Sequence, residues 1–160
     1  MQILVTGGVG FIGAHFVRAA CEAGHRVVVL DDLSGGEPLP LPPGATFVQG
    51  DIGDRVLLQM LCQHHHFEAV VHFAGKIQVG ESVQRPEIYY DVNLARSLTL
   101  LESLRQGGVR YFVFSSTAAV YGTPERVPIP EEAPKEPVNP YGATKHSFER
   151  ALAAYGPAYD

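Results

Sequence analysis

The segment NPYGATK, residues 139–145, places the phenol of Tyr141 four residues before the ammonium of Lys145. On a helix, residues at this spacing share one face, with Cβ atoms about 5–6 Å apart. An ammonium at that distance favours the phenolate and makes the tyrosine a usable base near neutral pH. Thr117 ends an apolar run and could offer its hydroxyl to the same substrate oxygen. Alone, this spacing is typical of a surface pair, so its meaning depends on the rest of the chain.

A glycine cluster stands near the start of the chain, in TGGVGFIG at residues 6–13. It follows one apolar run and opens a helical pattern. In such a unit the early glycines allow a tight turn, Gly10 lets the backbone approach a pyrophosphate, and Gly13 lets helix and strand pack closely. The phosphates then meet the positive N-terminus of the helix. The cluster lacks the Gly-Lys-Ser/Thr ending of a nucleoside triphosphate loop, so a dinucleotide is favoured.

Asp31 and Asp32 end the second apolar run, about twenty residues after the glycines, where dinucleotide-binding folds carry the carboxylate for the adenosine ribose. A carboxylate there repels a 2′-phosphate. The sequence therefore predicts NAD rather than NADP, unless the glycines form only a structural turn and the aspartate is there by chance.

The elements that hold these residues follow from the hydrophobic pattern. Five short apolar runs are mostly continuous, as strands of a parallel sheet covered on both faces require. They cover residues 3–6, 26–30, 46–49, 69–73 and 111–116. Helical patterns cover residues 11–23, 55–62, 86–106 and 141–155. This order predicts an α/β fold with a doubly wound parallel sheet and right-handed crossovers.

Several residues mark the expected helix ends. Gly24, Gly107-Gly108 and Gly156-Pro157 are suited to end helices, and Asn139 to cap the last one before Pro140. Two loops, residues 34–44 and 122–140, are rich in proline and glycine. The first loop is equally compatible with a disordered surface loop and with a functional loop. The second leads to the helix of Tyr141, which favours function.

Composition limits the partners and the location. The 160 residues carry a net charge of −5, which predicts no nucleic-acid or membrane surface. The sequence shows no charged leader and no run of about twenty apolar residues, so we expect neither a signal peptide nor a membrane span. Cys21 and Cys62 are isolated and predicted to be reduced, which favours the cytoplasm. The neighbouring histidines 64–66 cannot all face one ion, so no metal site is expected.

The chain resembles the extended short-chain dehydrogenase/reductases of the NAD-dependent epimerase/dehydratase family, and most closely the UDP-glucose (UDP-galactose) 4-epimerases. The resemblance rests on specific motifs along the whole chain. They are VTGGVGFIGAHFV, DDLSGG, GDIGD, VVHFAGKIQVGESV, PEIYYDVN and FSSTAAVYG followed by NPYGATK. It implies a Rossmann fold that binds NAD.

The resemblance also implies a role for each matching residue. The catalytic group is Thr117, Tyr141 and Lys145, of which Tyr141 and Lys145 also bind the cofactor. The other residues implied to bind NAD are Gly7, Gly10, Phe11, Ile12, Gly13, Asp31, Asp51, Ile52, Phe73, Ala74, Gly75 and Asn93. In that set, Asp31 holds the adenosine ribose, Asp51-Ile52 the adenine, and Asn93 supports the structure beside the cofactor.

Two alanines favour one reaction within the family. Related 4,6-dehydratases carry an Asp-Glu pair just after the catalytic threonine, because elimination of water needs a further acid and base. Sugar-nucleotide decarboxylases usually keep a glutamate there. This chain has Ala118 and Ala119. The resemblance therefore implies epimerisation at C4 of a UDP-hexose through a transient 4-keto sugar, with the sugar itself left open.

Three differences from the family are visible. Arg96 replaces a frequent glycine, and Lys76 lies one position earlier than the lysine that some members place near the pyrophosphate. The resemblance also covers only the first half of such an enzyme. Residues 1–160 are thus expected to form the dinucleotide-binding domain, truncated after the Tyr-x-x-x-Lys helix and without a substrate domain. The alternative function is an NAD-binding module without turnover.

The resemblance further implies a homodimer, since relatives dimerise through a four-helix bundle. The two helices concerned are those expected at residues 86–106 and 141–155. Their apolar residues are Val92, Leu94, Leu98, Leu101 and Leu104 in the first, and Phe148, Leu152 and Tyr155 in the second. The strand at residues 111–116 would also present an open edge. Alternatively, all these residues pack inside a monomer.

Overall fold

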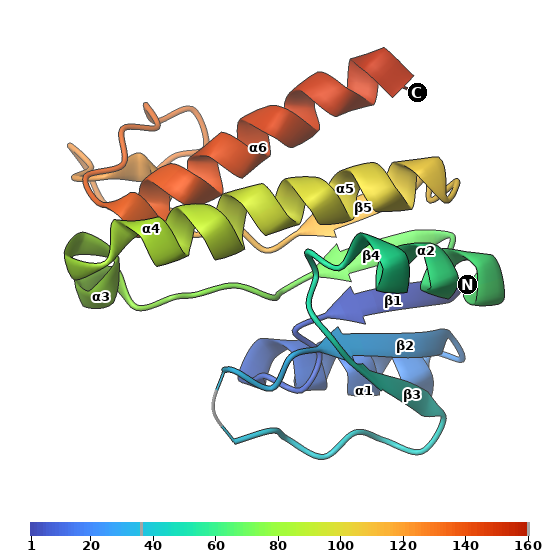
Figure 1. The fold of residues 1–160 in the computed structure, drawn as a ribbon. Coiled ribbons are helices and arrows are strands. Elements are labelled where there is room, and N and C mark those ends of the chain that lie inside the picture. Colours follow the sequence, from blue (N-terminus) through green and yellow to red (C-terminus); the bar gives the residue numbers. More distant parts are fainter. Residues whose placement is uncertain (36, 160) are drawn as a thin grey trace. The chain divides into compact units, whose positions relative to one another are not determined.

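The computed structural model describes residues 1–35 and 37–159, so that Gly36, in the first proline-rich and glycine-rich loop, and Asp160 lie outside the described residues (Figure 1). The chain forms two compact units. Unit 1 consists of Met1–Ala74 and Thr99–Ser115, and unit 2 of Gly75–Leu98 and the chain from Ser116 onward.

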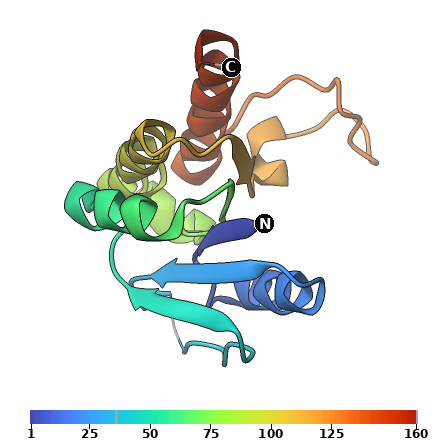
Figure 2. The same ribbon diagram turned by 90° about the vertical axis from the view of Figure 1, so that its right-hand side faces the viewer.

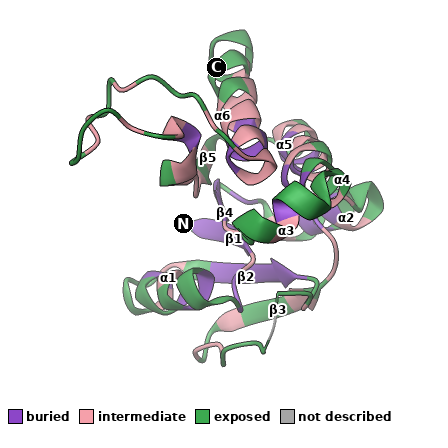
Figure 3. Ribbon diagram, turned by 90° about the vertical axis from the view of Figure 1, so that its left-hand side faces the viewer, coloured by how far each residue is buried: buried purple, intermediate pink, exposed green. Residues whose placement is uncertain are grey.

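Unit 1 is built on a five-stranded parallel sheet in the order β3-β2-β1-β4-β5. Its strands are β1 (Gln2–Thr6), β2 (Arg26–Asp31), β3 (Ala45–Gln49), β4 (Ala69–His72) and β5 (Tyr111–Phe114). Every neighbouring pair is parallel. The predicted doubly wound α/β fold is confirmed, and each strand matches its predicted run to within two residues. Figure 3 shows β1 and β2 as buried strands, as the continuous apolar runs predicted.

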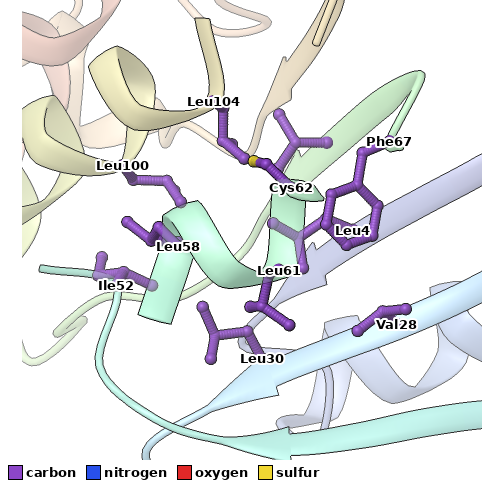
Figure 4. Close-up of a cluster of buried hydrophobic side chains, with 11 residues drawn as sticks. Leu4, Val28, Leu30, Ile52, Leu58, Leu61, Cys62, Phe67, Leu100 and Leu104 are labelled. Atoms are coloured by element: carbon purple, nitrogen blue, oxygen red, sulfur yellow. The ribbon is translucent and has the colours of Figure 1, made fainter. Parts of the chain in front are cut away.

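Helices cover both faces of this sheet, because alternate residues of each strand point to opposite sides. On one face, α1 (Phe11–Glu22) packs against Ile3 and Val5 of β1. On the other, Leu4 packs with α2 (Arg55–His65) and with the unit 1 part of α5 (Ser97–Gln106). Figure 2 shows α1 and α2 on opposite sides of the sheet, and Figure 4 shows the leucines of α2 and α5 that fill the second face.

The strand order reverses between β1 and β4. In open parallel sheets, ligands bind beyond the carboxyl ends of the strands at such a switch point. Here a side-chain hydrogen bond joins the carboxyl ends of β1 and β4. Thr6 Oγ1 and His72 Nδ1 lie 2.6 Å apart, and both residues are buried. The fold thus places the glycine cluster, which follows Thr6, at the position where a dinucleotide is expected.

Unit 2 is mostly helical. It contains α3 (Val79–Gln84), α4 (Pro86–Tyr89), the π-helix η1 (Tyr90–Arg96), the 3₁₀-helix η2 (Ala118–Tyr121) and α6 (Pro140–Tyr159). The long helix α6 packs against the other four elements. Tyr89 and Phe148 are fully buried in this unit. Helix α3 was not predicted, because its six residues are too few to show a clear apolar period.

The single α-helix expected at residues 86–106 is wrong in its middle, where the chain forms the π-helix η1. Two side-chain contacts follow the five-residue spacing of π-helical bonding. Arg96 Nε donates to Asp91 Oδ2 at 2.9 Å, and Ser97 Oγ donates to the carbonyl of Val92 at 3.4 Å. Arg96, the residue that replaces a frequent glycine, is therefore part of an ion pair across this turn.

The predicted stop at Gly156-Pro157 is also wrong, since α6 continues through Pro157 to Tyr159. A proline costs a helix the hydrogen bond of its own missing N–H and a clash with the preceding turn. Pro157 lies in the last turn of α6, so the helix ends two residues after the lost bond and its middle is not interrupted. The start of α6 is as predicted, because Asn139 Oδ1 accepts a hydrogen bond from Gly142 N at 2.8 Å.

Candidate functional site

The glycine segment of unit 1 combines three closely packed glycines, Gly7, Gly8 and Gly13, with one open glycine, Gly10. Gly7 has φ +70°, and a Cβ there would lie 2.5 Å from Ala74 N. A Cβ on Gly13 would lie 2.1 Å from the carbonyl oxygen of Gly7. Gly10 is exposed, and its nearest such contact is 3.4 Å. Packing therefore requires Gly7 and Gly13 to lack side chains, whereas Gly10 leaves free space that a ligand could approach.

The N-terminus of α1 lies directly behind Gly10. Gly10 is the N-cap residue and has no side chain to accept hydrogen bonds from the first turn. The first N–H groups of a helix carry a partial positive charge and bind anions such as phosphate. Phe11 and Ile12 in this turn are 76% and 61% exposed, a marked exposure for large apolar side chains. The arrangement can hold a phosphate group with apolar surface beside it.

Asp31, the last residue of β2, fastens this segment with its carboxylate. Its Oδ2 accepts from Val9 N at 3.3 Å and its Oδ1 from Leu33 N at 3.0 Å. A carboxylate offers about four acceptor positions, so two backbone bonds leave capacity for ligand hydroxyls. Asp32 is exposed and accepts from Ser34 N at 2.9 Å, within its own turn. The buried Asp31 is thus the carboxylate joined to the glycine segment.

The remaining predicted residues of unit 1 differ in what they present. Asp51 Oδ1 accepts from Gly53 N at 2.6 Å in the turn before α2. Ile52 packs in the core against Leu58, so only its backbone is available for a ligand. Phe73 packs on the α1 face of the sheet, and Ala74 lies against Gly7.

In unit 2, the start of α6 carries Tyr141 and Lys145 one turn apart. Gly142 allows η2 to approach closely, because a Cβ there would lie 2.5 Å from the carbonyl oxygen of Ala119. Tyr141 is half-buried, and its ring meets that of Tyr89 edge-on with centroids 6.4 Å apart. Tyr89 is itself fixed, since its hydroxyl donates to Glu81 Oε2 at 2.8 Å.

Lys145 is buried, with 4% of its surface exposed. Burial lowers the pKa of Lys145 from its ordinary value to about 8, because the ammonium is removed from water. A cation held at this cost inside a protein is typical of a functional site. The ammonium lies near Gly75, where a Cβ would be 3.8 Å from Nζ.

Asn93 holds the segment next to Lys145. Its Oδ1 accepts from Lys76 N at 2.8 Å, and its Nδ2 donates to the carbonyl of Lys76 at 2.9 Å. Its Nδ2 also lies 3.5 Å from Thr144 Oγ1. A Cβ on Gly75 would lie 2.9 Å from Asn93 Oδ1. Asn93 thus uses its whole amide to place residues 75–76 beside α6.

Thr117 precedes η2 in an extended conformation, and its Oγ1 accepts from Ala119 N at 3.2 Å. The acceptor side of the hydroxyl is used locally, which leaves its proton available for donation. Unit 2 therefore holds a phenol, an ammonium and a hydroxyl on adjoining elements.

One contact group was missed by the sequence reasoning. Glu149 of α6 accepts from Ser116 Oγ at 2.5 Å and from Lys135 Nζ at 2.7 Å. The signal was present in the spacing, since Glu149 follows Lys145 by four residues and Tyr141 by eight, along one side of the helix.

Two kinds of site are absent from residues 1–35 and 37–159. No helix there is long and apolar enough to cross a membrane. The same residues contain no group of three or more His, Cys, Asp and Glu side chains that could hold a metal ion.

The buried ammonium leads to a stability prediction for Lys145→Met. Because burial lowers its pKa to about 8, the folded chain binds this proton less tightly than the unfolded chain. We expect Lys145→Met to raise the free energy of unfolding at pH 7 by on the order of 1–3 kcal/mol. The gain should shrink as the pH rises above 8, where the folded parent no longer buries a charge.

Urea unfolding at pH 7 and at pH 9.5 measures this difference. Lys135→Met is the control, because Lys135 forms a surface ion pair and its replacement should change stability by less than about 1 kcal/mol. A Lys145→Met protein less stable than the parent at pH 7 would contradict the prediction.

Known proteins resemble this chain over nearly all of its length. It is 49% identical to the UDP-glucose 4-epimerase of Azospirillum brasilense, in a match that covers 99% of this chain and 45% of the relative. The UDP-glucose 4-epimerase of Brucella ovis, solved in complex with NAD, has a TM-score of 0.94 and 40% identity over 99% of this chain and 48% of that one. That of Thermotoga maritima, solved with UDP-glucose, has a TM-score of 0.94 and 39% identity over 99% and 52% of the two chains.

This chain thus spans about half the length of the relatives that it matches. The model of the NAD dependent epimerase/dehydratase family matches residues 3–160. With this match over nearly the whole sequence, on a fold that carries the expected glycine, aspartate, tyrosine and lysine residues, the chain belongs to the NAD dependent epimerase/dehydratase family.

Proposed function

We propose that this chain binds NAD and takes part in the 4-epimerisation of a UDP-hexose, the interconversion of UDP-glucose and UDP-galactose. The observation that carries the proposal is the joint placement of Thr117, Tyr141 and Lys145 in unit 2, with Lys145 buried as an ammonium. The relatives named above as UDP-glucose 4-epimerases support the choice of reaction. Residues 1–160 serve as the dinucleotide-binding part of this activity.

The residues of unit 1 fit a dinucleotide. Gly10 and the start of α1 offer open backbone and a positive helix end for the pyrophosphate, and Asp31 offers a fixed carboxylate for the adenosine ribose. In this proposal Asp51 and the Ile52 backbone bind the adenine. Phe73 and Ala74 line the cofactor within unit 1, and Gly75 and Asn93 do so within unit 2.

The choice of epimerisation depends on the residues after Thr117. The helix η2 begins with Ala118 and Ala119, which carry neither an acid nor a base. Elimination of water from a sugar needs such groups next to the reacting carbons. Epimerisation needs one base that first removes and then returns the same proton, and Tyr141 suffices for that.

The proposed steps assign one task to each side chain. When bound, NAD supplies the reversible oxidation of the sugar at C4. Tyr141, as the phenolate, takes the proton of the O4 hydroxyl while C4 becomes a ketone. The ammonium of Lys145 stabilises that phenolate, and the hydroxyl of Thr117 donates to O4. After the 4-keto sugar presents its other face, Tyr141 returns the proton to O4.

The cofactor assignment predicts a difference between two neighbouring carboxylates. Asp31→Asn removes the charge that strengthens the hydrogen bonds to the ribose, so NAD affinity should fall by on the order of 1.5–3 kcal/mol. Asp32→Asn is the matched control and should leave affinity within about twofold. The parent should bind NADP more weakly than NAD. Calorimetric titration measures all of these affinities, and a parent that prefers NADP would remove Asp31 from the role.

The role of Tyr141 predicts a loss of turnover in Tyr141→Phe. Removal of a general base typically costs about 10²–10⁴-fold in rate. The control is Tyr155→Phe on the same helix, which should retain the parent's rate. The assay is the interconversion of UDP-glucose and UDP-galactose with NAD. Equal rates for Tyr141→Phe and the parent would end the assignment, and a parent that binds NAD without turnover would instead be a cofactor-binding module.

We also propose that the chain forms a homodimer through η1, α5 and α6. Phe148, Leu101 and Leu104 are buried, whereas Leu94, Leu98, Leu152 and Tyr155 keep partly exposed apolar surface. Sedimentation at several concentrations should show a dimer that Leu152→Glu converts to a monomer. Val127→Glu is the control, because Val127 is exposed on the loop of residues 122–139, outside these helices. It should leave the dimer intact. A parent that is monomeric at every concentration would overturn the proposal.

A further inference from the structure

Glu149 lies on the side of α6 that carries Tyr141 and Lys145, and the proposed steps give it no task. Its side chain is 21% exposed, and its carboxylate contacts three other residues. Oε1 accepts from Ser116 Oγ at 2.5 Å, and Oε2 accepts from Lys135 Nζ at 2.7 Å. His146 Nδ1 lies 3.5 Å from Oε2. His146 lies on α6 itself, so the carboxylate joins α6 to two other stretches of unit 2, at Ser116 and at Lys135.

The two hydrogen bonds of Glu149 are stronger than bonds between neutral groups, because its carboxylate is ionised. Burial raises the pKa of Glu149, but the hydrogen bonds from Lys135 and Ser116 outweigh burial, and the pKa lies below its ordinary value. The same contact raises the pKa of Lys135. The ion pair is therefore fully formed at neutral pH.

The contact with Ser116 fixes one end of the segment that contains Thr117. The other end is fixed where η2 meets the start of α6. There the carbonyl of Ala119 packs against Gly142, in space that a side chain on Gly142 would fill. These two attachment points on α6, at Glu149 and Gly142, are seven residues apart, or about 10 Å along the axis. Thr117 lies between Ser116 and Ala119 and is held at both sides.

The contact with Lys135 fixes the loop of residues 122–139, which connects η2 to α6. Most of this loop is exposed, including Arg126 and Val127. A second close approach occurs at its beginning, where a Cβ on Gly122 would lie 2.0 Å from the carbonyl oxygen of Glu136. The Lys135 ion pair therefore fastens a stretch of loop that is already folded back on η2.

We propose that Glu149 is a positioning residue that holds two segments on α6 at once: residues 116–121, which set the place of the Thr117 hydroxyl, and the loop 122–139. The importance of Thr117 rests on the proposed function, whereas the two attachments do not. Oε1 holds the first segment through Ser116, and Oε2 holds the second through Lys135. Separate substitutions can release one segment without the other.

Four variants distinguish the two attachments. Ser116→Ala removes only the first and Lys135→Met only the second. Glu149→Ala removes both. Glu149→Gln keeps a hydrogen-bonding partner for Ser116 but removes the charge that pairs with the Lys135 ammonium, so that only the loop is released. Glu102→Ala is the control, because Glu102 accepts comparable bonds from Arg105 and Gln106, both on its own helix.

Two measurements report on the two segments. Hydrogen exchange at the amides of Ala119 and Val120, which bond to Thr117, reports on residues 116–121. The rate of tryptic cleavage after Arg126 reports on the loop. Exchange should rise about tenfold in Ser116→Ala and Glu149→Ala and stay unchanged in Glu149→Gln and Lys135→Met. Cleavage should become several times faster in Lys135→Met, Glu149→Gln and Glu149→Ala, and stay unchanged in Ser116→Ala.

The proposal is overturned if Glu149→Ala behaves like Glu102→Ala in either measurement, since both segments are claimed. It is equally overturned if Glu149→Gln releases residues 116–121. Where the parent interconverts UDP-glucose and UDP-galactose, Ser116→Ala should lower kcat about tenfold with KM within twofold, and Lys135→Met should change neither. An inactive parent would contradict the proposed reaction, whereas the exchange and cleavage patterns would still decide the role of Glu149.

Discussion

The close contact between Gly13 and the carbonyl oxygen of Gly7 is the constraint on which unit 1 depends. It brings the first turn of α1 against the end of β1, at the point where the strand order of the sheet reverses. Gly7 in turn packs on the backbone of Ala74, two residues after the end of β4. Three chain segments thus meet with no side chain between them. The backbone itself forms the surface at this edge of the sheet, and that is what a pyrophosphate requires.

The sequence predicted the parts of the structure that depend on local chemistry. The strands, the cap at Asn139 and the helix ends at Gly24 and Gly108 follow from residue types whose conformational preferences are strong. The glycine spacing and the Tyr141–Lys145 spacing are similarly local. The sequence could not show η1, because an apolar pattern does not separate a π-turn from an α-turn. It could not show that α6 continues beyond Pro157, because a proline ordinarily marks the end of a helix. The short helix α3 has too few residues to show a period.

Contacts between distant residues were the other part that the pattern could not supply. The Asn93 amide hydrogen-bonds to the backbone of Lys76, and a backbone partner cannot be identified from residue types. Glu149 was visible as a residue in step with Lys145, but its partners come from a strand end and a loop. The buried state of Lys145 follows from the same packing. Its charge opposes folding, and the burial of large apolar side chains elsewhere in unit 2, such as Tyr89 and Phe148, offsets that cost.

The π-helix η1 changes how this part of the chain should be compared with other sequences. A helix bonded over five residues contains one residue more per turn than the α-helical spacing allows. Side chains before and after Asn93 therefore fall out of phase by about 100° relative to a continuous α-helix. An alignment with a sequence whose helix is continuous must treat the extra residue as an insertion, and a designed deletion there would rotate the side chains that follow about the helix axis.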